Sequence, residues 1–549
     1  MNLPFFPASG ETYGPASPAR RSFLLASSLS TALGALPAWA RRGEQLGHNP
    51  FGLGVASGDP EPDNVLLWTR LVAPPASLGQ ITTAELPPLK VRWELAHDAQ
   101  FQHLVSHGEA MARPELGHGV HVQVNGLAPD RWYFYRFMQG DAVSATGRSR
   151  TAPATGSPAA RLRLAFASCQ RWEHGYYAAW RQVAEDAPDL VLFLGDYIYE
   201  YAAPALTLGL ARPQPLRAAQ NLQDYRDRYA LHKSDPLLQA AHAACNWAVI
   251  WDDHEVENDY AGALGRGDAA QFLARRAAAW QAFYENMPLR ASVLGGAWDH
   301  HGKGLAGLQL YRSLRWGDLA HLHLLDGRQF RSPQACRAPG QANTGTVQPA
   351  QCPALQDPAR SFLGHAQEQW LYQQLRGDSA SHGNGPRWSL LGQSTLFSPR
   401  HLPSGAESTD PWDGYPAARQ RFAQQIAQSG PRNTVLLGGD LHQNYVCSIA
   451  RDCSQPPGKG NPVVASEFCG TSISSRSGTQ QAKVDAIVAN NPQVLFARCE
   501  ERGYGLLDIT PRAVTTELRA VANPMRADTT VYTLARFAVQ NGVPGPVRI

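Results

Sequence analysis

Short stretches of alternating hydrophobic and polar residues fill the chain between residues 51 and 151. Val120, Val122 and Val124 form one such stretch, and they would share one face of an extended strand because successive side chains point to opposite faces. The pair Asn125-Gly126, which favours a tight turn, follows directly. Equivalent alternation recurs at Leu89, Val91, Trp93 and Leu95, and at Tyr133, Tyr135 and Phe137. The pattern predicts a β-sandwich, in which each strand buries one face.

The pattern changes after residue 158. Residues 151–158 read T-A-P-A-T-G-S-P, a run of small residues and prolines that is typical of a linker. Apolar stretches then alternate with helical ones, such as Ala269 to Tyr284 and Gln367 to Leu375. The predicted strands are Leu162 to Ala167, Leu190 to Leu194, Asn246 to Trp251, Leu319 to Leu325, Trp388 to Leu391 and Thr434 to Leu437. We expect an immunoglobulin- or fibronectin-like β-sandwich over residues 41–152, a large α/β domain over residues 159–525 and a C-terminal tail over residues 526–549.

The first 40 residues have the features of a targeting segment. Arg20 and Arg21 precede an apolar stretch that runs with small residues to Leu36, and Ala38 and Ala40 form an A-x-A cleavage motif. This order is typical of a twin-arginine signal peptide. A membrane anchor is the alternative, but the apolar run is too short and too rich in serine to cross about 30 Å of hydrocarbon. The twin-arginine export machinery is therefore a predicted partner, and the mature chain is expected in the periplasm or outside the cell.

Composition narrows the classes of function. Among 549 residues, 49 Lys and Arg balance 46 Asp and Glu to a formal net charge of +3, which argues against a dedicated nucleic-acid-binding module. No segment after the signal reaches 18 uninterrupted apolar residues, so we expect no membrane span in the mature protein. Cys336 and Cys352 flank a segment rich in Gly, Pro, Gln and Asn, where a disulfide would close a surface loop. Cys447 and Cys453 allow a second pair.

Polar side chains that can bind metal follow the ends of four predicted strands. The carboxyl ends of strands in an open α/β sheet form its usual ligand-binding edge, so residues distant in sequence can meet there. A single Gly-Asp pair at a strand end is usually only a turn, but four such segments together are specific. The candidate metal ligands are Cys169, Asp196, Tyr199, Asp253, Asp440 and His442.

The four segments read S-C-Q, G-D-Y-I-Y, D-D-H-E and G-D-L-H, an order that resembles the calcineurin-like metallophosphatase superfamily. Cys in the first segment and Asp in the third and fourth, where other members carry Asn and His, are similar to the PhoD-like alkaline phosphatase/phosphodiesterase family. The resemblance covers nearly the whole chain after the signal, and it implies an αββα sandwich as the catalytic fold. Gly392-Gln393-Ser394 departs from the family's usual Gly-Asn-Gln or Gly-Gln-Gln, which leaves the role of Gln393 and Ser394 open.

The resemblance also implies roles for the candidate residues. Fe³⁺ would be held by Cys169, Asp196, Tyr199 and His442, and one or more Ca²⁺ ions by Asp196, Asp253 and Asp440. Donor chemistry agrees, because thiolate and phenolate stabilise a trivalent ion whereas carboxylates favour a hard divalent cation. His254 matches the superfamily histidine that assists the leaving group or the oxyanion; the alternative is that it only orders the loop through a hydrogen bond to a neighbouring carboxylate. Arg328 and Asn258 are candidate substrate contacts on their residue types.

These assignments predict an exported, metal-dependent phosphoesterase. It would hydrolyse phosphate monoesters, diesters or both by attack of a metal-activated water at alkaline pH. One alternative is a phosphatase similar to the purple acid phosphatases, with Zn²⁺ or Mn²⁺ as the second metal. The other is an inactive extracellular protein that uses its β-sandwich for binding.

The signal-peptide assignment predicts that Arg20 and Arg21 are required for export. In the double variant Arg20→Lys and Arg21→Lys, full-length precursor should accumulate inside the cell, whereas the native chain should be cut near Arg41. Immunoblotting of cytoplasmic and periplasmic fractions measures this, and an unchanged periplasmic amount would contradict the prediction.

Overall fold

The structure is a computed structural model that describes residues 48–73, 87–204, 208–295, 308–338, 341, 343–379, 385–429 and 433–549. The predicted signal peptide and its cleavage site lie outside the described residues. Among the helices that are described, none combines the length and hydrophobicity needed to cross a lipid bilayer.

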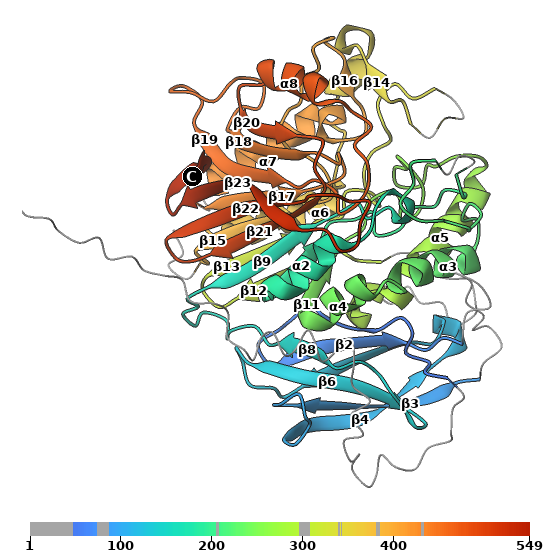
Figure 1. The fold of residues 1–549 in the computed structure, drawn as a ribbon. Coiled ribbons are helices and arrows are strands. Elements are labelled where there is room, and N and C mark those ends of the chain that lie inside the picture. Colours follow the sequence, from blue (N-terminus) through green and yellow to red (C-terminus); the bar gives the residue numbers. More distant parts are fainter. Residues whose placement is uncertain are drawn as a thin grey trace, which may run out of the picture. The chain divides into compact units, whose positions relative to one another are not determined.

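Two large sheets form the centre of the fold (Figure 1). The first has the strand order β24-β23-β22-β21-β9-β10-β11-β1-β2-β5, and its middle strands β9 (Leu162–Ala167), β10 (Leu190–Phe193) and β11 (Asn246–Val249) are parallel. Antiparallel strands β21 (Gly503–Ile509), β22 (Ala513–Val521), β23 (Val531–Gln540) and β24 (Val543–Arg548) extend it on one side. Residues 526–549, expected as a tail, thus contain two strands of this sheet.

The second sheet has seven strands in the order β12-β13-β15-β17-β19-β18-β20. Its parallel strands are β13 (Ala320–Leu324), β15 (Trp388–Gly392), β17 (Thr434–Gly438) and β19 (Val463–Cys469), and its antiparallel ones are β12 (Arg312–Trp316), β18 (Asn444–Ala450) and β20 (Val494–Arg498). All six strands predicted in the α/β region are present, with bounds that differ by at most two residues. Their continuous apolar character follows from burial of both faces of a parallel sheet.

The two sheets face each other across one hydrophobic layer. Leu164 and Leu192 of the first sheet and Leu390 and Val435 of the second lie in this layer. The opposite face of the first sheet packs on α2 (Ala178–Asp186), α3 (Leu222–Lys233), α4 (Pro236–Ala244) and α5 (Ala269–Asn286). The opposite face of the second packs on α6 (His365–Gly377), α7 (Pro416–Ser429) and α8 (Gln481–Ala489). The predicted αββα sandwich is therefore confirmed.

The N-terminal region adds a further layer. Strands β4 (Leu104–Ala112), β3 (Leu89–Ala96), β6 (Trp132–Gln139), β7 (Ala142–Val143) and β8 (Gly147–Arg150) form a separate sheet. It packs on β1 (Val55–Gly58), β2 (Asn64–Arg70) and β5 (Gly119–Asn125), the strands at one end of the ten-stranded sheet. Strand β1 pairs in parallel with β11, where Ser57 is opposite Asn246. The β-sandwich and the catalytic layers therefore share one continuous sheet.

Of the two cysteine pairs that the sequence suggests, one forms a disulfide. Cys336 and Cys352 form a disulfide with 5.9 Å between their Cα atoms. Cys447 and Cys453, which the sequence allows to pair, are both free thiols, and Cys453 instead lies 3.7 Å from the Ala450 carbonyl oxygen.

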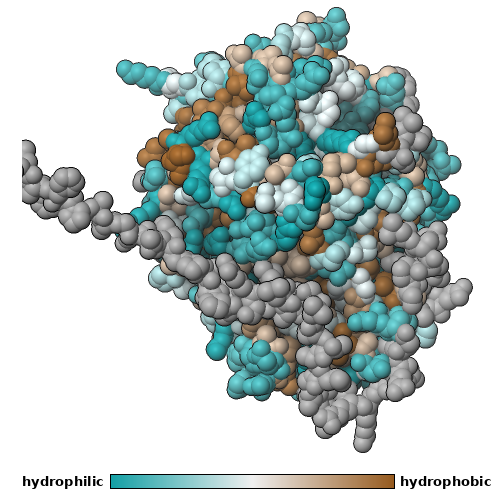
Figure 2. Space-filling view, in the orientation of Figure 1, coloured by the Kyte–Doolittle hydropathy of each residue, from teal (hydrophilic) through white to brown (hydrophobic). Residues whose placement is uncertain are grey.

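Strand β24 forms an edge of the ten-stranded sheet and carries the exposed hydrophobic residues Val543 and Val547. Figure 2 shows hydrophobic atoms gathered at the left of the molecule, where the C-terminus lies in Figure 1. Pro544 and Pro546 lie within this strand and have no backbone N–H to donate. The prolines make the strand a poor template for pairing with another chain.

Candidate metal centre

The candidate ligands lie on tight loops at the carboxyl ends of β9, β10, β11 and β17. Cys169, Asp196, Asp440 and His442 all have positive φ angles, of 58°, 59°, 64° and 56°. L-residues adopt this left-handed region at a cost of roughly 1–3 kcal/mol each when the surrounding structure enforces it. Strained backbone of this kind clusters at functional sites, which supports these loops as a candidate site.

Gly195 allows the loop after β10 to approach the loop after β11. It has a φ of 107°, and a Cβ placed on it would lie 2.5 Å from the backbone nitrogen of Asp252. Only glycine fits this close approach, which sets Asp196 beside the segment that carries Asp253.

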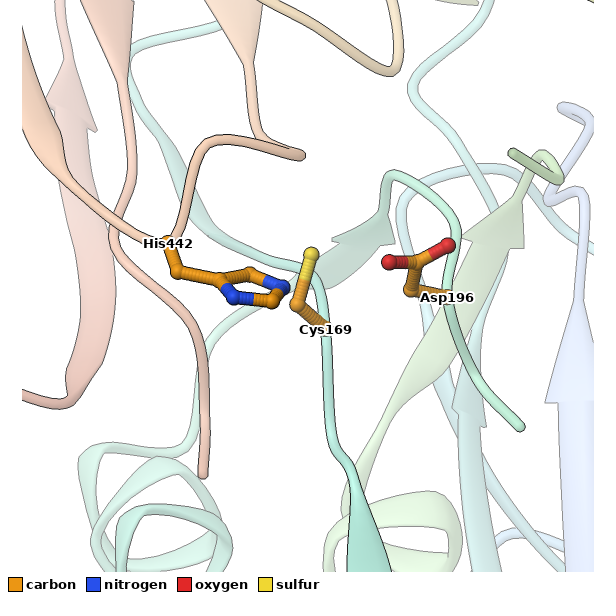
Figure 3. A group of neighbouring side chains, drawn as sticks. All are labelled: Cys169, Asp196 and His442. Carbon is orange, nitrogen blue, oxygen red and sulfur yellow. The ribbon is translucent and has the colours of Figure 1, made fainter. Parts of the chain in front are cut away.

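Cys169, Asp196 and His442 form a first group in which one ligand atom from each residue lies within 4.8 Å of the others. Figure 3 shows these side chains coming from three separate segments of the chain. The Tyr199 hydroxyl completes the group, because it lies 3.0 Å from Asp196 Oδ2 and 3.1 Å from His442 Nε2. Ser475 Oγ lies 2.7 Å from the same hydroxyl. The four residues that sequence assigned to the first metal are thus together.

Asp196 also belongs to a second group, with Asp253 and His254, in which the ligand atoms again lie within 4.8 Å of one another. Asp440, the expected third ligand of the second metal, has an oxygen 2.8 Å from the donor Thr395 Oγ1. Burial raises the pKa of Asp440, and the negative charges of Asp252 and Asp253 raise it further. Asp440 is not one of the three residues of the second group. Asp196 is therefore positioned between two adjacent sets of donors.

The centre concentrates groups whose ionised forms are anionic. Burial, reinforced by the neighbouring carboxylates, raises the pKa of Cys169, Asp196, Tyr199 and Asp440 well above their ordinary values. Asp196 Oδ1 is buried and has no hydrogen-bond partner among the described residues. A buried carboxylate oxygen without a donor is costly, and a bound cation would satisfy it. The residues present therefore fit a metal centre.

His442 is held in the form that binds metal. Its Nδ1 lies 2.8 Å from the Arg476 carbonyl oxygen, so that nitrogen carries the proton and Nε2 presents its lone pair to the centre. Burial, with a smaller contribution from the Arg502 charge, lowers the pKa of His442 to about 3. The imidazole is consequently neutral at neutral pH.

Arg328 and Asn258, the expected substrate contacts, have other partners. Arg328 is fully buried; its Nε donates to Asp252, and its two terminal nitrogens donate to the two oxygens of Asp410 at 2.7 and 2.9 Å. It also lies 3.7 Å from Asp253 Oδ2. The Asn258 side-chain oxygen accepts a hydrogen bond from the Tyr201 hydroxyl at 2.8 Å.

Comparison with known proteins identifies the family of this chain. A model of the PhoD-like phosphatase family matches residues 164–518, and a model of the family's N-terminal domain matches residues 37–153. The chain belongs to the PhoD-like phosphatase family. It is 39% identical over 505 residues to alkaline phosphatase D of Bacillus subtilis (strain 168), covering 90% of this chain and 82% of that protein. A solved structure of PhoD superposes with a TM-score of 0.82 and 37% identity, covering 92% of this chain and 93% of that one.

Family membership makes the chain an enzyme, a PhoD-like phosphatase, and favours this over the inactive binding protein. The clusters of buried donors described above are its candidate metal sites.

Several residues that organise this PhoD-like phosphatase were not singled out from sequence. Glu255 is fully buried and accepts hydrogen bonds from the backbone N–H groups of Asp196, Tyr197 and Asp252, at 3.0, 2.6 and 2.8 Å. Glu200 Oε2 lies 2.7 Å from His254 Nδ1. Both residues lie inside the sequence segments that carry the ligands, so they could have been identified as site residues from their position in these segments. Asp410 and Ser475 lie in segments where no local pattern marks them as part of the site.

A third group of potential ligands lies away from the phosphatase centre. His321 and His323 of β13 approach Asp378, with nitrogen-to-oxygen distances of 2.7 and 2.8 Å. Ser389 also donates to Asp378, and Ser313 lies 2.8 Å from the second nitrogen of His323. These groups satisfy one another without an ion, so the cluster is a buried polar network that links β13 to the end of α6.

Glu255 should be required to hold the metal-binding loops together. In Glu255→Gln, the side-chain NH₂ would face a backbone N–H that donates to the carboxylate in the native protein. We therefore expect the free energy of unfolding to fall by about 1–3 kcal/mol and the metal content to decrease. Urea unfolding and elemental analysis measure the two effects.

Glu109→Gln is the matched control, because Glu109 lies on the exposed face of β4 and should have little effect. Equal stability and metal content in Glu255→Gln and the control would show that the loops do not depend on this carboxylate.

Proposed function

We propose that this PhoD-like phosphatase is an exported enzyme that hydrolyses phosphate monoesters, diesters or both at alkaline pH, with Fe³⁺ and Ca²⁺ as its metals. The observation that carries the proposal is Asp196, a buried carboxylate that belongs to two adjacent donor groups and has one oxygen without a hydrogen-bond partner in the described part of the chain. A carboxylate in this position is suited to bridge two metal ions.

The donor types divide the two sites. Cys169, Tyr199 and His442 would hold Fe³⁺ together with Asp196, because thiolate and phenolate favour a trivalent ion. Asp253 and Asp440 would hold Ca²⁺ from the other side of Asp196, since an all-carboxylate set favours a hard cation and lacks the imidazole that suits Zn²⁺. When bound, the metals would supply positive charge for the phosphoryl oxygens and lower the pKa of an attacking water.

His254 would give a proton to the leaving group. Burial lowers the pKa of His254, but the negative charges of Glu200, Asp253 and Asp196 outweigh burial and raise it well above the ordinary value. A raised pKa favours the protonated imidazole, which is the form that a general acid requires. Glu200 fixes the ring through Nδ1 and leaves Nε2 for the substrate side.

Arg328 acts in this proposal as a positioning residue. Its guanidinium is buried and forms ion pairs with the carboxylates of Asp252 and Asp410. Its positive charge also contributes to holding the pKa of Asp253 below the ordinary value, despite burial, so that Asp253 is an ionised ligand.

Export belongs to the same proposal. The paired arginines, the apolar run and the A-x-A motif support twin-arginine transport, a route that carries folded proteins and therefore suits an enzyme that binds its metals before export.

Metal exchange tests the proposed function. A calcium-selective chelator should abolish hydrolysis of a panel of phosphate monoesters and diesters, while the visible absorption that arises from Fe³⁺ bound to thiolate and phenolate remains. Added Ca²⁺ should restore turnover. Recovery with Zn²⁺ but not with Ca²⁺ would favour the alternative similar to purple acid phosphatases, and an iron-free, colourless, fully active protein would contradict the first-site assignment.

The pH profile tests the pairing of Glu200 with His254. The carboxylate raises the pKa of His254, so activity that needs the protonated ring is present below that pKa and is lost as pH rises through it. Glu200→Gln removes the charge and should move the alkaline limb of the kcat profile to lower pH by about 1–2 units, as expected for loss of a charged hydrogen bond.

Glu500→Gln, at an exposed glutamate, is the control and should leave the profile in place. An alkaline limb that does not move in Glu200→Gln would rule out His254 as the group that this limb reports.

A further inference from the structure

Arg171 lies two residues after Cys169 and is held firmly at its backbone and at one side-chain nitrogen. Its backbone N–H donates to Ser475 Oγ at 3.0 Å, and its Nε donates to Glu173 Oε1 at 2.6 Å. Glu173 is buried, which limits competition by water for this hydrogen bond. The two terminal nitrogens of Arg171 have no hydrogen-bond partner among the described residues.

The guanidinium of Arg171 packs against two tyrosine rings at the metal centre. Its central carbon lies 5.5 Å from the ring centroid of Tyr199 and 5.1 Å from that of Tyr201. His254 packs on the same two rings, with centroid distances of 4.3 and 5.2 Å. Arg171 therefore packs on the ring whose hydroxyl contacts the candidate ligand Asp196, and 21% of its side chain remains exposed to solvent.

The positive charge of Arg171 lies beside a candidate site for metal cations. A fixed guanidinium beside a site for multivalent cations is repelled by them, and Glu173 is the one carboxylate within ion-pair distance of Arg171 in the described part of the chain. An anion that binds both the metals and the guanidinium would reverse that repulsion. The planar fork of arginine matches the oxygens of a phosphoryl group, and the terminal nitrogens of Arg171 donate to no other described residue.

We propose that Arg171 forms an anion subsite beside the metal centre, in which its terminal nitrogens bind a non-bridging oxygen of the phosphoryl group. The subsite takes the phosphate ester as substrate and inorganic phosphate as product. This inference rests on the proposed function and adds a residue to it: Arg171 strengthens phosphoryl binding, whereas His254 serves proton transfer.

Binding of inorganic phosphate to the metal-loaded protein tests the subsite without turnover. Calorimetric titration should give a Kd at least tenfold higher in Arg171→Gln than in the native protein, and an intermediate value in Arg171→Lys, which keeps the charge but loses the fork. The KM for a phosphate ester should rise in parallel, while the visible iron absorption stays unchanged.

Arg161→Gln is the matched control for net charge. Arg161 precedes the first residue of β9, at the end of the strand opposite to the metal centre, and pairs with Asp508 on an exposed surface. It should leave phosphate affinity unchanged, and an equal loss in this control would overturn the proposal.

Two further outcomes are decisive. Native phosphate affinity in a folded Arg171→Gln protein that retains its iron absorption would also overturn the proposal; if that variant fails to fold, native affinity in Arg171→Lys would do the same. A native protein that binds phosphate through Arg171 but hydrolyses no ester would contradict the proposed function alone.

Discussion

Negative charge buried at one edge of two sheets is the constraint on which the rest of this structure depends. Asp196, Asp252, Asp253 and Asp440 all lie in or beside the loops that leave the parallel strands. Protein groups compensate some of this charge: Arg328 neutralises Asp252, and the Asp259 backbone N–H donates to Asp253 at 2.6 Å. Burial raises the pKa of Asp196 and Asp440 because nothing sufficiently compensates their ionised forms, and a bound cation would stabilise those forms.

The scaffold meets this constraint with buried carboxylates that bind backbone N–H groups. Glu255 joins the loops after β10 and β11 in the first sheet. In the second sheet, Glu467 of β19 accepts hydrogen bonds from the backbone N–H groups of Phe397 and Ser398, in the loop after β15, at 2.6 and 2.8 Å. Burial raises the pKa of each to about 7, against the backbone hydrogen bonds that favour the charged form. Each carboxylate thus fixes a loop that presents ligands or their donors.

Much of the fold was predictable because its strands are local patterns. The stretch Leu162–Ala167 was predicted with its observed bounds, and the alternation at Val120, Val122 and Val124 corresponds to β5. Pairing of β1 with β11 was not predictable, since nothing in the residues of either strand specifies a partner nearly 190 residues away. Sequence therefore predicted a sandwich but not that one of its sheets continues into the catalytic layer.

The candidate site was likewise predictable only in part. Its ligands follow strands within short recognisable segments, whereas the residues that orient them are identified by contact alone. Arg328 was expected at substrate because arginine commonly binds phosphate, but its burial among Asp252, Asp253 and Asp410 depends on three other segments. Ser475, which links Cys169, Arg171 and Tyr199, comes from a loop more than 270 residues later.

The order of these residues along the chain has a consequence for biosynthesis. Cys169 and Asp196 leave the ribosome early, but His442 and Ser475 emerge only when most of the polypeptide has been made, and β21, the neighbour of β9, comes later still. A nascent chain consequently carries exposed thiol and carboxylate donors with no finished cavity around them. Assembly of the first donor set is thus a late event of synthesis. Metal bound at this centre would therefore indicate that both halves of the αββα sandwich have come together.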